Sequence, residues 1–449
     1  MATSTYLQNT HTGTGSSSGA KSTMSVWIKR TDILGDSRST IIGARTDDNN
    51  YFKVRFADND RLMVFGLKSG SGSINIETDA EFRDIFSWYH VVLQIDTTSS
   101  TETERVKWYV NGELQTIRTS GRDYPSQNDV NHLTSASDIN IGCNAVSSPN
   151  EHFDGTMSHF HMIDGTIYPP TAFGSTDSTT GEWKINTSPS VTYGAKGYFI
   201  LKDGNSVTDA SGKGNNFTVA AGALTNTKDC PSNVFATWNS LVPLTTNYVY
   251  LNGNTSVNQT SGSWKKTVST IGVNSGKWYW EISATNAQIS AGKYTVIGVA
   301  TTTDATAPSG MSPRGIGMKS NGTVAISTST VATLSVFELG DIISCYLDMD
   351  NGALYYAKNG SMLNSGNPTS GSSKTGAFSL PYATETHFAY MAPYGTNNKA
   401  EANFGNGFFG TTAVTTNSGN GYAGAEGASK FKYQPPSGYS ALNTKGLNQ

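Results

Sequence analysis

The stretch YLDMDNGALYYAKNG (residues 346–360) decides the fold, because it contains two strands and the turn that joins them. On either side of Asn351-Gly352 the residues alternate with a period of two and are rich in aromatic and β-branched side chains, which is typical of strands. Asn-Gly between two such runs is the strongest local signal of a hairpin, because both central residues of a type I′ turn need a positive φ. We therefore predict a β-hairpin with Asn351 and Gly352 at its turn.

The acidic residues of the same stretch raise the alternative of a calcium loop. Asp348 and Asp350 would fill the first and third positions of the pattern D-x-[DN]-x-[DN]-G-x5-E. Gly352 then falls at a ligand position, and Asn359 falls where the bidentate Glu is required. A plain turn is therefore favoured over a metal site, and we expect the two aspartates, two residues apart, to share one face of the strand.

Short strand-like runs recur along the chain and are separated by clusters of Gly, Ser, Asn and Asp. They include residues 24–30, 51–57, 88–96, 105–112, 277–284, 294–301, 341–350 and 353–360. No segment shows a sustained helical period, so the pattern predicts an all-β fold of sandwiches or barrels. A second Asn-Gly turn, at Asn111-Gly112, also ends an aromatic strand, and two separate sandwiches of related design explain this better than a repeat array.

Composition excludes several classes of protein. Charged residues make up only 14% of the 449 residues and the formal net charge is -3, with no basic stripe, so nucleic acid is not an expected partner. No apolar run is long enough for a membrane span, and MATSTYLQNT does not resemble a signal peptide. Cys143, Cys230 and Cys345 show neither a disulfide framework nor zinc-ligand spacing, so we expect free thiols and no cofactor.

Two stretches resemble known domain families. Residues 1–180 resemble a LamG-like domain of the concanavalin A-type jelly-roll class, on the pieces STMSVWIKR, FSWYHVVLQID, VKWYVNGEL, INIGC and FDGTMSHFHMIDG. Residues 270–405 resemble a SPRY domain, on GKWYWEI, IGVAT, GIGM, LGDIISCYLDMDNGALYYAKNG and ANFG. The resemblance implies two antiparallel concanavalin A-like, jelly-roll β-sandwiches in tandem. We expect a LamG-like sandwich over 1–180, a partly β connector over 181–240, a SPRY-like sandwich over 241–410 and a Gly/Ser-rich tail over 411–449.

The connector and the tail carry a further resemblance. The segments DGTIYPPTAFG, GYFI, DASGKGNNFT and FKYQPPSGYSALNTKGL, with the pattern D-x-P-x-N-x-F-A-T, are similar to a layout found in structural proteins of tailed bacteriophages, especially marine (cyanophage-type) ones. This resemblance implies a protein made in the host cytoplasm and located on the surface of the virion, with other virion proteins as partners and a homo-oligomeric assembly.

The function expected from these resemblances is binding. We expect a non-enzymatic tail-fibre-like or receptor-binding component that binds a host-surface glycan or protein. A capsid decoration or head-fibre protein with a mainly structural role is the alternative, and a polysaccharide depolymerase is the least favoured one. Glycan hydrolases on jelly-roll folds place carboxylates on one strand, as in E-x-D-x-x-E, and this spacing does not occur here. Glu102 and Glu104 are the nearest pair, but they lie in a polar loop, and GTGSSSGAKST (13–23) lacks the spacing of a phosphate loop.

His152, His159 and His161 are the weak candidates for metal ligands. His159 and His161 are two residues apart in a strand-like run, so they would share one face and could hold a transition metal. No third ligand from a neighbouring strand can be named. We therefore expect exposed or hydrogen-bonded histidines and no bound metal.

Ligand contacts on a rigid sandwich are expected on its loops. In SPRY domains the loop that corresponds to residues 301–315 contributes to the ligand surface, and Arg314 at its end is our single expected contact residue. A solvated loop arginine is the alternative. Tryptophans within strands are expected in the core, although the sequence does not decide which face of 278–280 is buried; they are Trp27, Trp88, Trp108, Trp278 and Trp280.

The C-terminal tail leaves two interpretations open. Residues 411–429 are rich in Gly, Ser, Thr and Asn, like a flexible connector, whereas residues 430–442 carry several aromatic residues and prolines and little charge. Such apolar material, if exposed, usually marks a contact. The tail either covers the chain's own sandwich or seats the protein on the virion, and no separate N-terminal anchor is expected, because the LamG-like part begins by about residue 5.

Overall fold

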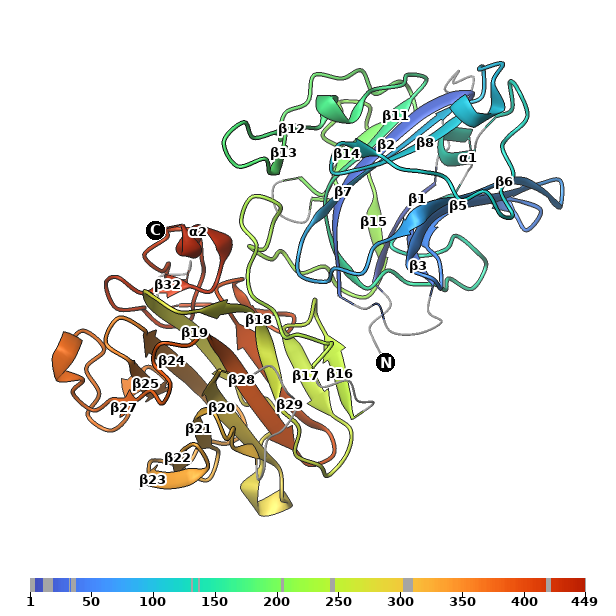
Figure 1. Ribbon diagram of the computed structural model, residues 1–449. Coiled ribbons are helices and arrows are strands. Elements are labelled where there is room, and N and C mark those ends of the chain that lie inside the picture. The colour runs from blue at the N-terminus through green and yellow to red at the C-terminus, as the bar shows by residue number, and fades with distance from the viewer. Residues whose placement is uncertain are drawn as a thin grey trace. The chain divides into compact units, whose positions relative to one another are not determined.

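The structure is a computed structural model that describes residues 5–10, 19–31, 33, 38–130, 132–135, 138–202, 206–242, 247–301, 310–416 and 421–448. The chain forms two compact units, Met1–Asn226 and Thr227–Gln449, each built almost entirely of antiparallel sheets (Figure 1). The α-helices of the described residues, α1 (His132–Ser135) and α2 (Thr444–Leu447), are about one turn long, and neither could cross a membrane. The prediction of an all-β fold with two sandwiches in tandem is confirmed.

The described residues of the first unit form two large sheets and a small one. The larger sheet has the strand order β15 (Thr218–Ala221), β1 (Tyr6–Thr10), β10 (Asp138–Ile141), β3 (Ser39–Asp47), β4 (Asn50–Phe56), β5 (Arg61–Lys68) and β6 (Ser71–Glu81). The second has the order β14 (Tyr198–Ile200), β11 (Gly155–Asp164), β2 (Lys21–Arg30), β7 (Tyr89–Asp96), β8 (Val106–Val110) and β9 (Glu113–Leu114). β12 (Gly174–Thr176) and β13 (Trp183–Ile185) pair with each other.

The core of the first unit consists of side chains from both large sheets. Val26 and Val91 from one sheet and Ile42 and Val54 from the other belong to a single cluster and have no exposed surface. Trp108 of β8 is fully buried in the same cluster. Because side chains alternate between the two faces of a strand, every second residue points into this core, which explains the period of two in the sequence.

The other face of the sheet that contains β2 is also covered. Phe173, Tyr193 and Phe199 form a second apolar cluster there, and the ring of His161 stacks on Phe199 with centroids 3.9 Å apart. This second layer explains why every residue of β2 after Lys21 is buried.

The segment expected to be a connector (181–240) is divided between the two units. β14 and β15 each add a strand to a sheet of the first unit, and Phe217 enters the core of that unit. Trp183 donates a hydrogen bond from Nε1 to Nδ1 of His90 (3.0 Å). Residues 181–226 are therefore part of the first sandwich, residues 227–240 belong to the second unit, and the boundary between the units differs from the expected limits at 180 and 240.

The second unit has a similar plan. Its larger sheet has the order β16 (Tyr248–Leu251), β17 (Ser256–Gln259), β29 (Asn398–Asn403), β19 (Lys277–Ser283), β24 (Ile342–Asp348), β25 (Ala353–Lys358) and β26 (Ser361–Met362), with β27 (Phe378–Ser379) on β25 and β32 (Ser440–Ala441) on β19. The other sheet has the order β18 (Thr267–Val273), β28 (His387–Tyr394), β20 (Tyr294–Ala300), β21 (Gly315–Lys319), β22 (Thr323–Ile326) and β23 (Ser329–Thr333). β30 (Phe408–Phe409) and β31 (Thr412–Ala413) form a short hairpin.

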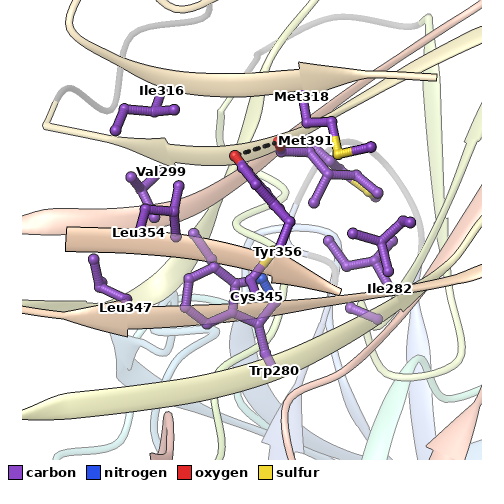
Figure 2. Close-up of a cluster of buried hydrophobic side chains, with 14 of the residues drawn as sticks. Trp280, Ile282, Val299, Ile316, Met318, Cys345, Leu347, Leu354, Tyr356 and Met391 are labelled. Carbon is purple, nitrogen blue, oxygen red and sulfur yellow. Dashed lines mark hydrogen bonds between the residues drawn. The ribbon is translucent and has the colours of Figure 1, made fainter. Parts of the chain in front are cut away.

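Figure 2 shows the core between the two large sheets of the second unit. Trp280 and Cys345 come from the larger sheet, and Val299 comes from the other; none of the three has exposed surface. Tyr356 crosses between the sheets, and its hydroxyl donates to the backbone oxygen of Ile297 (3.2 Å). A buried tyrosine hydroxyl usually needs such a partner.

The five tryptophans expected in the core are confirmed, because none is more than 6% exposed. Trp278 and Trp280 share one face of β19 and belong to the core between the sheets. Tyr279 points to the opposite face and belongs to a different buried cluster, which includes Phe431 and Tyr439 of the C-terminal segment. Both faces of residues 278–280 are therefore buried.

The hairpin at 346–360 is present, but its turn is not the predicted type I′ turn. Asp348 pairs with Ala353, so four residues connect the strands, and Gly352 has a φ of +62° whereas Asn351 does not have a positive φ. The Asp348 carboxylate accepts hydrogen bonds from the backbone nitrogen (3.0 Å) and Nδ2 (2.8 Å) of Asn351. This side-chain contact stabilises a turn in which Asn351 does not have a positive φ. At Asn111-Gly112 both residues have positive φ, 50° and 84°, and the predicted turn is confirmed.

We expect Gly352→Val to destabilise the second unit by about 1–3 kcal/mol, because a β-branched residue tolerates a positive φ poorly. A Cβ at this position would also lie 3.3 Å from Cβ of Ala383. Gly352→Asn is the matched variant, since Asn adopts the left-handed conformation more easily, and it should cost clearly less. Urea unfolding of both variants measures the difference, and equal costs would contradict the backbone explanation.

The C-terminal segment packs on the second unit instead of projecting from it. Phe431 and Tyr439 have no exposed surface, and Leu442 is 1% exposed. β32 lies parallel to the first residues of β19 (Figure 1), with Ser440 opposite Trp278. Of the two interpretations of the tail, the structure shows the one in which it covers the chain's own sandwich. The other interpretation, in which the tail helps to seat the protein on the virion, is left without these three side chains, because they are used in the core.

A buried carboxylate fastens this segment to the sheet. Glu281 of β19 has no exposed surface and accepts hydrogen bonds from the backbone nitrogens of Lys432 (2.9 Å) and Tyr433 (2.7 Å). The Tyr279 hydroxyl (2.8 Å) and Nδ2 of Asn403 (3.1 Å) also donate to it. Burial is the largest influence on this carboxyl and raises its pKa from 4.5 to about 7, although these hydrogen bonds lower it.

The raised pKa of Glu281 predicts that the second unit loses stability as the pH rises. The folded state binds the proton of this carboxyl more tightly than the unfolded state, so the contribution is fully present below about pH 4.5 and is lost through about pH 7. Between about pH 5 and about pH 8 the loss should be on the order of 2–3 kcal/mol. Glu281→Gln does not titrate, so urea unfolding of the wild type and this variant at both pH values isolates the effect. The free energy of unfolding of the variant should rise relative to that of the wild type as the pH rises. A difference between the two that stays constant, or that changes in favour of the wild type, would contradict the prediction.

Candidate binding surface on the second unit

Arg314, the contact residue expected from the sequence, lies at one end of the six-stranded sheet of the second unit, the sheet that contains β20, β21 and β28. It directly precedes β21, and its backbone oxygen accepts a hydrogen bond from the Thr301 nitrogen (2.9 Å), which continues the pairing of β20 with β21. Of the loop 301–315, residues 302–309 lie outside the described residues. The side chain of Arg314 is 38% exposed.

Arg314 is held by partners within the chain. Its Nη2 donates to both carboxylate oxygens of Glu385, at 2.5 and 2.7 Å, and its Nε donates to Oγ1 of Thr301 (3.2 Å). The guanidinium carbon lies 4.0 Å from the centroid of the Tyr382 ring, which is the geometry of a cation–π contact. The side chain of Arg314 is therefore partly exposed, and it also forms an ion pair with Glu385 and a contact with the Tyr382 ring.

The cluster of Arg314, Tyr382 and Glu385 is open to solvent. Tyr382 is 42% exposed, and so is the side chain of Glu385. The hydrogen bond from Arg314 is the main cause that lowers the pKa of the Glu385 carboxyl, and the same bond raises the pKa of the guanidinium. Exposed ion pairs contribute little to folding stability, so stability gives little reason for this arrangement.

Tyr382 adopts a strained backbone conformation. Its φ is +58°, in the left-handed region that non-glycine residues avoid, at a typical cost of about 1–3 kcal/mol. Its backbone oxygen accepts a hydrogen bond from the Glu385 nitrogen (2.9 Å), which closes a turn directly before β28. Strain of this kind concentrates at functional sites. The turn presents the ring to Arg314 and to solvent at once.

The partners of Arg314 could not be found in the sequence. Glu385 lies 71 residues away, and the pairing of β20 with β28 brings the two together. No local motif marks Tyr382 either. Together the three side chains offer a ring face, forked N–H donors and carboxylate oxygens, which are the components of a binding surface that recognises polar groups.

Asp348 and Asp350 do not form a site of their own. Asp348 is fully buried and lies 3.3 Å from Nζ of Lys277, while Oδ1 of Asp350 accepts from the Gly276 nitrogen (2.7 Å). The expectation that the two share a strand face is wrong, because β24 ends at Asp348 and Asp350 belongs to the turn. Both carboxylates hold the hairpin against the start of β19.

The histidines named as weak metal candidates have other contacts. Nδ1 of His161 forms a hydrogen bond with the Tyr193 hydroxyl (2.8 Å), and burial places its pKa well below the ordinary value. His159 forms a hydrogen bond with Ser158 (2.7 Å), and the ring of His152 lies beside Tyr6. Within the described parts of the chain, no three His, Cys, Asp or Glu side chains gather in a way that could hold a metal ion. The cysteines are free, and Cys143 and Cys345 are buried.

Comparison with protein families identifies both sandwiches. Residues 2–172 match the model of the concanavalin A-like lectin/glucanases superfamily, of laminin G type, and residues 277–407 match the model of the SPRY domain. The order of the two domains is the one expected from the sequence. Both are generic binding folds, and LamG-like and SPRY domains are usually not catalytic.

The solved structures similar to this chain each match only part of its length. The SPRY domain of human HERC1 is 18% identical, covers 34% of this chain and 91% of its own, and has a TM-score of 0.29. The heptameric SAP-like pentraxin from Limulus polyphemus is 14% identical, covers 37% of this chain and 72% of its own, and has a TM-score of 0.27. A human SPRY domain is 12% identical, covers 35% of this chain and 94% of its own, and has a TM-score of 0.26. A search of curated proteins found no match.

Proposed function

We propose that this protein is a non-enzymatic surface protein of a bacteriophage virion, a tail-fibre-like or receptor-binding component that binds a glycan or protein of the host surface. The tandem of a LamG-like and a SPRY sandwich supports a binding role. The virion assignment is supported by the similarity of DASGKGNNFT and its neighbouring segments to structural proteins of tailed phages. The proposed location is the particle surface, in a homo-oligomer with other virion proteins as neighbours.

The observation that carries the binding role is the exposed cluster of Arg314, Tyr382 and Glu385. A strained tyrosine, an arginine stacked on its ring and a carboxylate lie together at the end of a rigid sheet. Arginine and tyrosine are enriched among residues that dominate binding energy at interfaces. The C-terminal segment is not proposed as the virion anchor, because Phe431 and Tyr439 are buried in the second unit.

Arg314→Ala should weaken binding of the purified full-length protein to host cells by about tenfold or more, as expected for an arginine at the centre of an interface. Its melting temperature should stay close to that of the wild type, because an exposed ion pair contributes little to stability. Arg118→Ala is the matched control, since Arg118 is also paired, to Glu77, and its side chain is 42% exposed. Unchanged binding by the Arg314 variant, or an equal loss in both variants, would remove Arg314 from the proposed surface.

Immunogold labelling of intact particles tests the location. Label at the tail or its fibres supports a receptor-binding component, whereas label confined to the head supports the capsid decoration alternative. Absence of label from purified particles, with the protein present in infected cells, would overturn the virion assignment. Release of reducing ends from host polysaccharide by the purified protein would overturn the non-enzymatic assignment.

A further inference from the structure

The sheet that carries Arg314 also holds three aromatic side chains at its opposite end. Tyr294 and Tyr394 lie directly opposite each other on β20 and β28, and Trp264 precedes β18. The rings of Trp264 and Tyr394 stack with centroids 4.7 Å apart at an angle of 25°, and Tyr294 lies 6.4 Å from each. All three residues are half-buried, so each retains surface in contact with solvent.

The face of the sheet that these rings occupy is the one away from the sandwich core. Val296 follows Tyr294 by two residues and therefore shares its face. Val296 belongs to a separate apolar cluster that Trp264 also contacts, and not to the core shown in Figure 2. The three rings thus form part of the outer surface of the second unit.

Lys319 places a positive charge on the same rings. It is the last residue of β21 and lies opposite Val296, and its Nζ lies 4.5 Å from the centroid of Tyr294 and 4.9 Å from that of Trp264. Among the described residues it forms no ion pair with a carboxylate. Burial lowers the pKa of this ammonium group. Among the described residues the Lys319 ammonium is supported by aromatic rings alone, and such a half-buried lysine can still accept an anionic partner.

A buried side chain holds the backbone that carries the two tyrosines. Asn398 is fully buried, and its Nδ2 donates to the backbone oxygens of Tyr294 (2.6 Å) and Tyr394 (3.0 Å). One amide group therefore ties together the ends of β20 and β28 that carry the two tyrosines. A rigid aromatic surface loses little conformational entropy on binding, which favours affinity.

We propose that Trp264, Tyr294, Tyr394 and Lys319 form a binding site for an acidic saccharide, a pyranose that carries a carboxylate or a sulfate group. The C–H face of the sugar packs on the aromatic surface, and the anionic group forms a charge-assisted hydrogen bond with the Lys319 ammonium. A largely aromatic site with one well-placed polar group is the usual composition of a small-ligand site. A neutral sugar would leave the ammonium without an anionic partner, so the site should prefer the acidic one.

This site is distinct from the cluster around Arg314. Tyr294 begins β20, and Arg314 pairs next to the end of the same strand, which places the two roughly 20 Å apart along it. The inference adds a ligand class to the proposed host-surface binding. It does not depend on Arg314, so either proposal can fail alone.

Isothermal titration of the full-length protein with three probes tests the proposal. An oligogalacturonate supplies carboxylates, its methyl ester supplies the same ring without the charge, and a sulfated galactan oligosaccharide supplies sulfate. At least one acidic probe should bind about tenfold or more tightly than the ester, and the preference between the acidic probes identifies the anion. The affinity should fall as salt is raised.

Two variants and one control locate the binding. Lys319→Gln and Trp264→Ala should each reduce affinity for the acidic probe by about tenfold or more, whereas Lys228→Gln, at an exposed lysine of the same unit, should not. If Trp264→Ala does not fold, Lys319→Gln carries the test, because it changes only the charged end of a half-buried side chain. Lack of binding to both acidic probes, equal binding of the ester, or unchanged affinity of Lys319→Gln overturns the inference. Host-cell binding that depends on Arg314 but not on Lys319 would overturn this inference and leave the proposed function standing.

Discussion

Deletion of residues 430–449 should unfold the second unit, because this segment is part of its core. It removes the buried side chains of Phe431, Tyr439 and Leu442, and burial of each such side chain contributes about 1.5–3 kcal/mol. Their sum is comparable with the whole stability of a typical domain, about 5–15 kcal/mol. The deletion also removes the two backbone N–H groups that donate to the buried carboxylate of Glu281, which adds the cost of a poorly satisfied buried charge.

Hydrogen exchange of the truncated protein gives the measurement. Amides of β19 and β24 should lose their protection, whereas those of β2 and β7 in the first unit should keep it. Removal of 447–449 is the control, since Leu447 is 46% exposed, and it should leave β19 protected. Full protection of β19 after the longer deletion would show that the tail is not part of the core.

Local signals predicted the strands and one of the turns, and the exception has a local cause. The turn at Asn111-Gly112 follows from the two residues themselves, since both adopt positive φ. The turn at Asn351-Gly352 depends on a third residue, because the Asp348 carboxylate bonds to Asn351 and selects a longer connection. A dipeptide signal can therefore identify a hairpin and still misplace its geometry when a flanking side chain caps the turn.

The limits of the two units could not be predicted, because they depend on distant contacts. Composition marked residues 430–442 as apolar but could not say which surface they cover. The covered surface is fixed at Glu281, which accepts hydrogen bonds from the backbone nitrogens of Lys432 and Tyr433. These residues lie 151 and 152 positions further along the chain. In the same way, β15 joins the first sheet through β1, more than two hundred residues earlier.

The candidate sites also contain some residues that the sequence indicated and others that only the structure brings together. Arg314 was found through the resemblance of its loop to a SPRY ligand loop, but Glu385 and Tyr382 come from another segment. Trp264 has no periodic run around it. Tyr294 and Tyr394 lie at the ends of two strands, and the pairing of these strands cannot be read from the sequence. Motif analysis therefore does not detect an aromatic surface that is assembled from several strands, although each of its residues can be read in the sequence.

The second large effect is expected at a buried ion pair of the first unit. Arg30, the last residue of β2, has a side chain only 3% exposed, and its Nη2 lies 2.8 Å from Oδ1 of Asp60. Its Nη1 donates to the Phe82 backbone oxygen (2.5 Å), and its guanidinium carbon lies 4.2 Å from the centroid of the Phe56 ring. Arg83 pairs with the other oxygen of the same carboxylate (2.9 Å), but its side chain is 58% exposed.

Asp60→Ala should therefore destabilise the first unit by about 3–5 kcal/mol, because it removes the carboxylate that neutralises a buried guanidinium. Arg83→Ala, which breaks the exposed pair with the same carboxylate, should have little effect. Asp60→Asn keeps a residue that tolerates the φ of +62° at this position, so its cost reports the charge alone. Replacing both partners, as Arg30→Met with Asp60→Ala, should recover part of the loss, since an apolar pair leaves no buried charge. Urea unfolding followed by hydrogen exchange in β2 and β4 measures all four, and equal costs for Asp60→Ala and Arg83→Ala would show that burial does not set the strength of this pair.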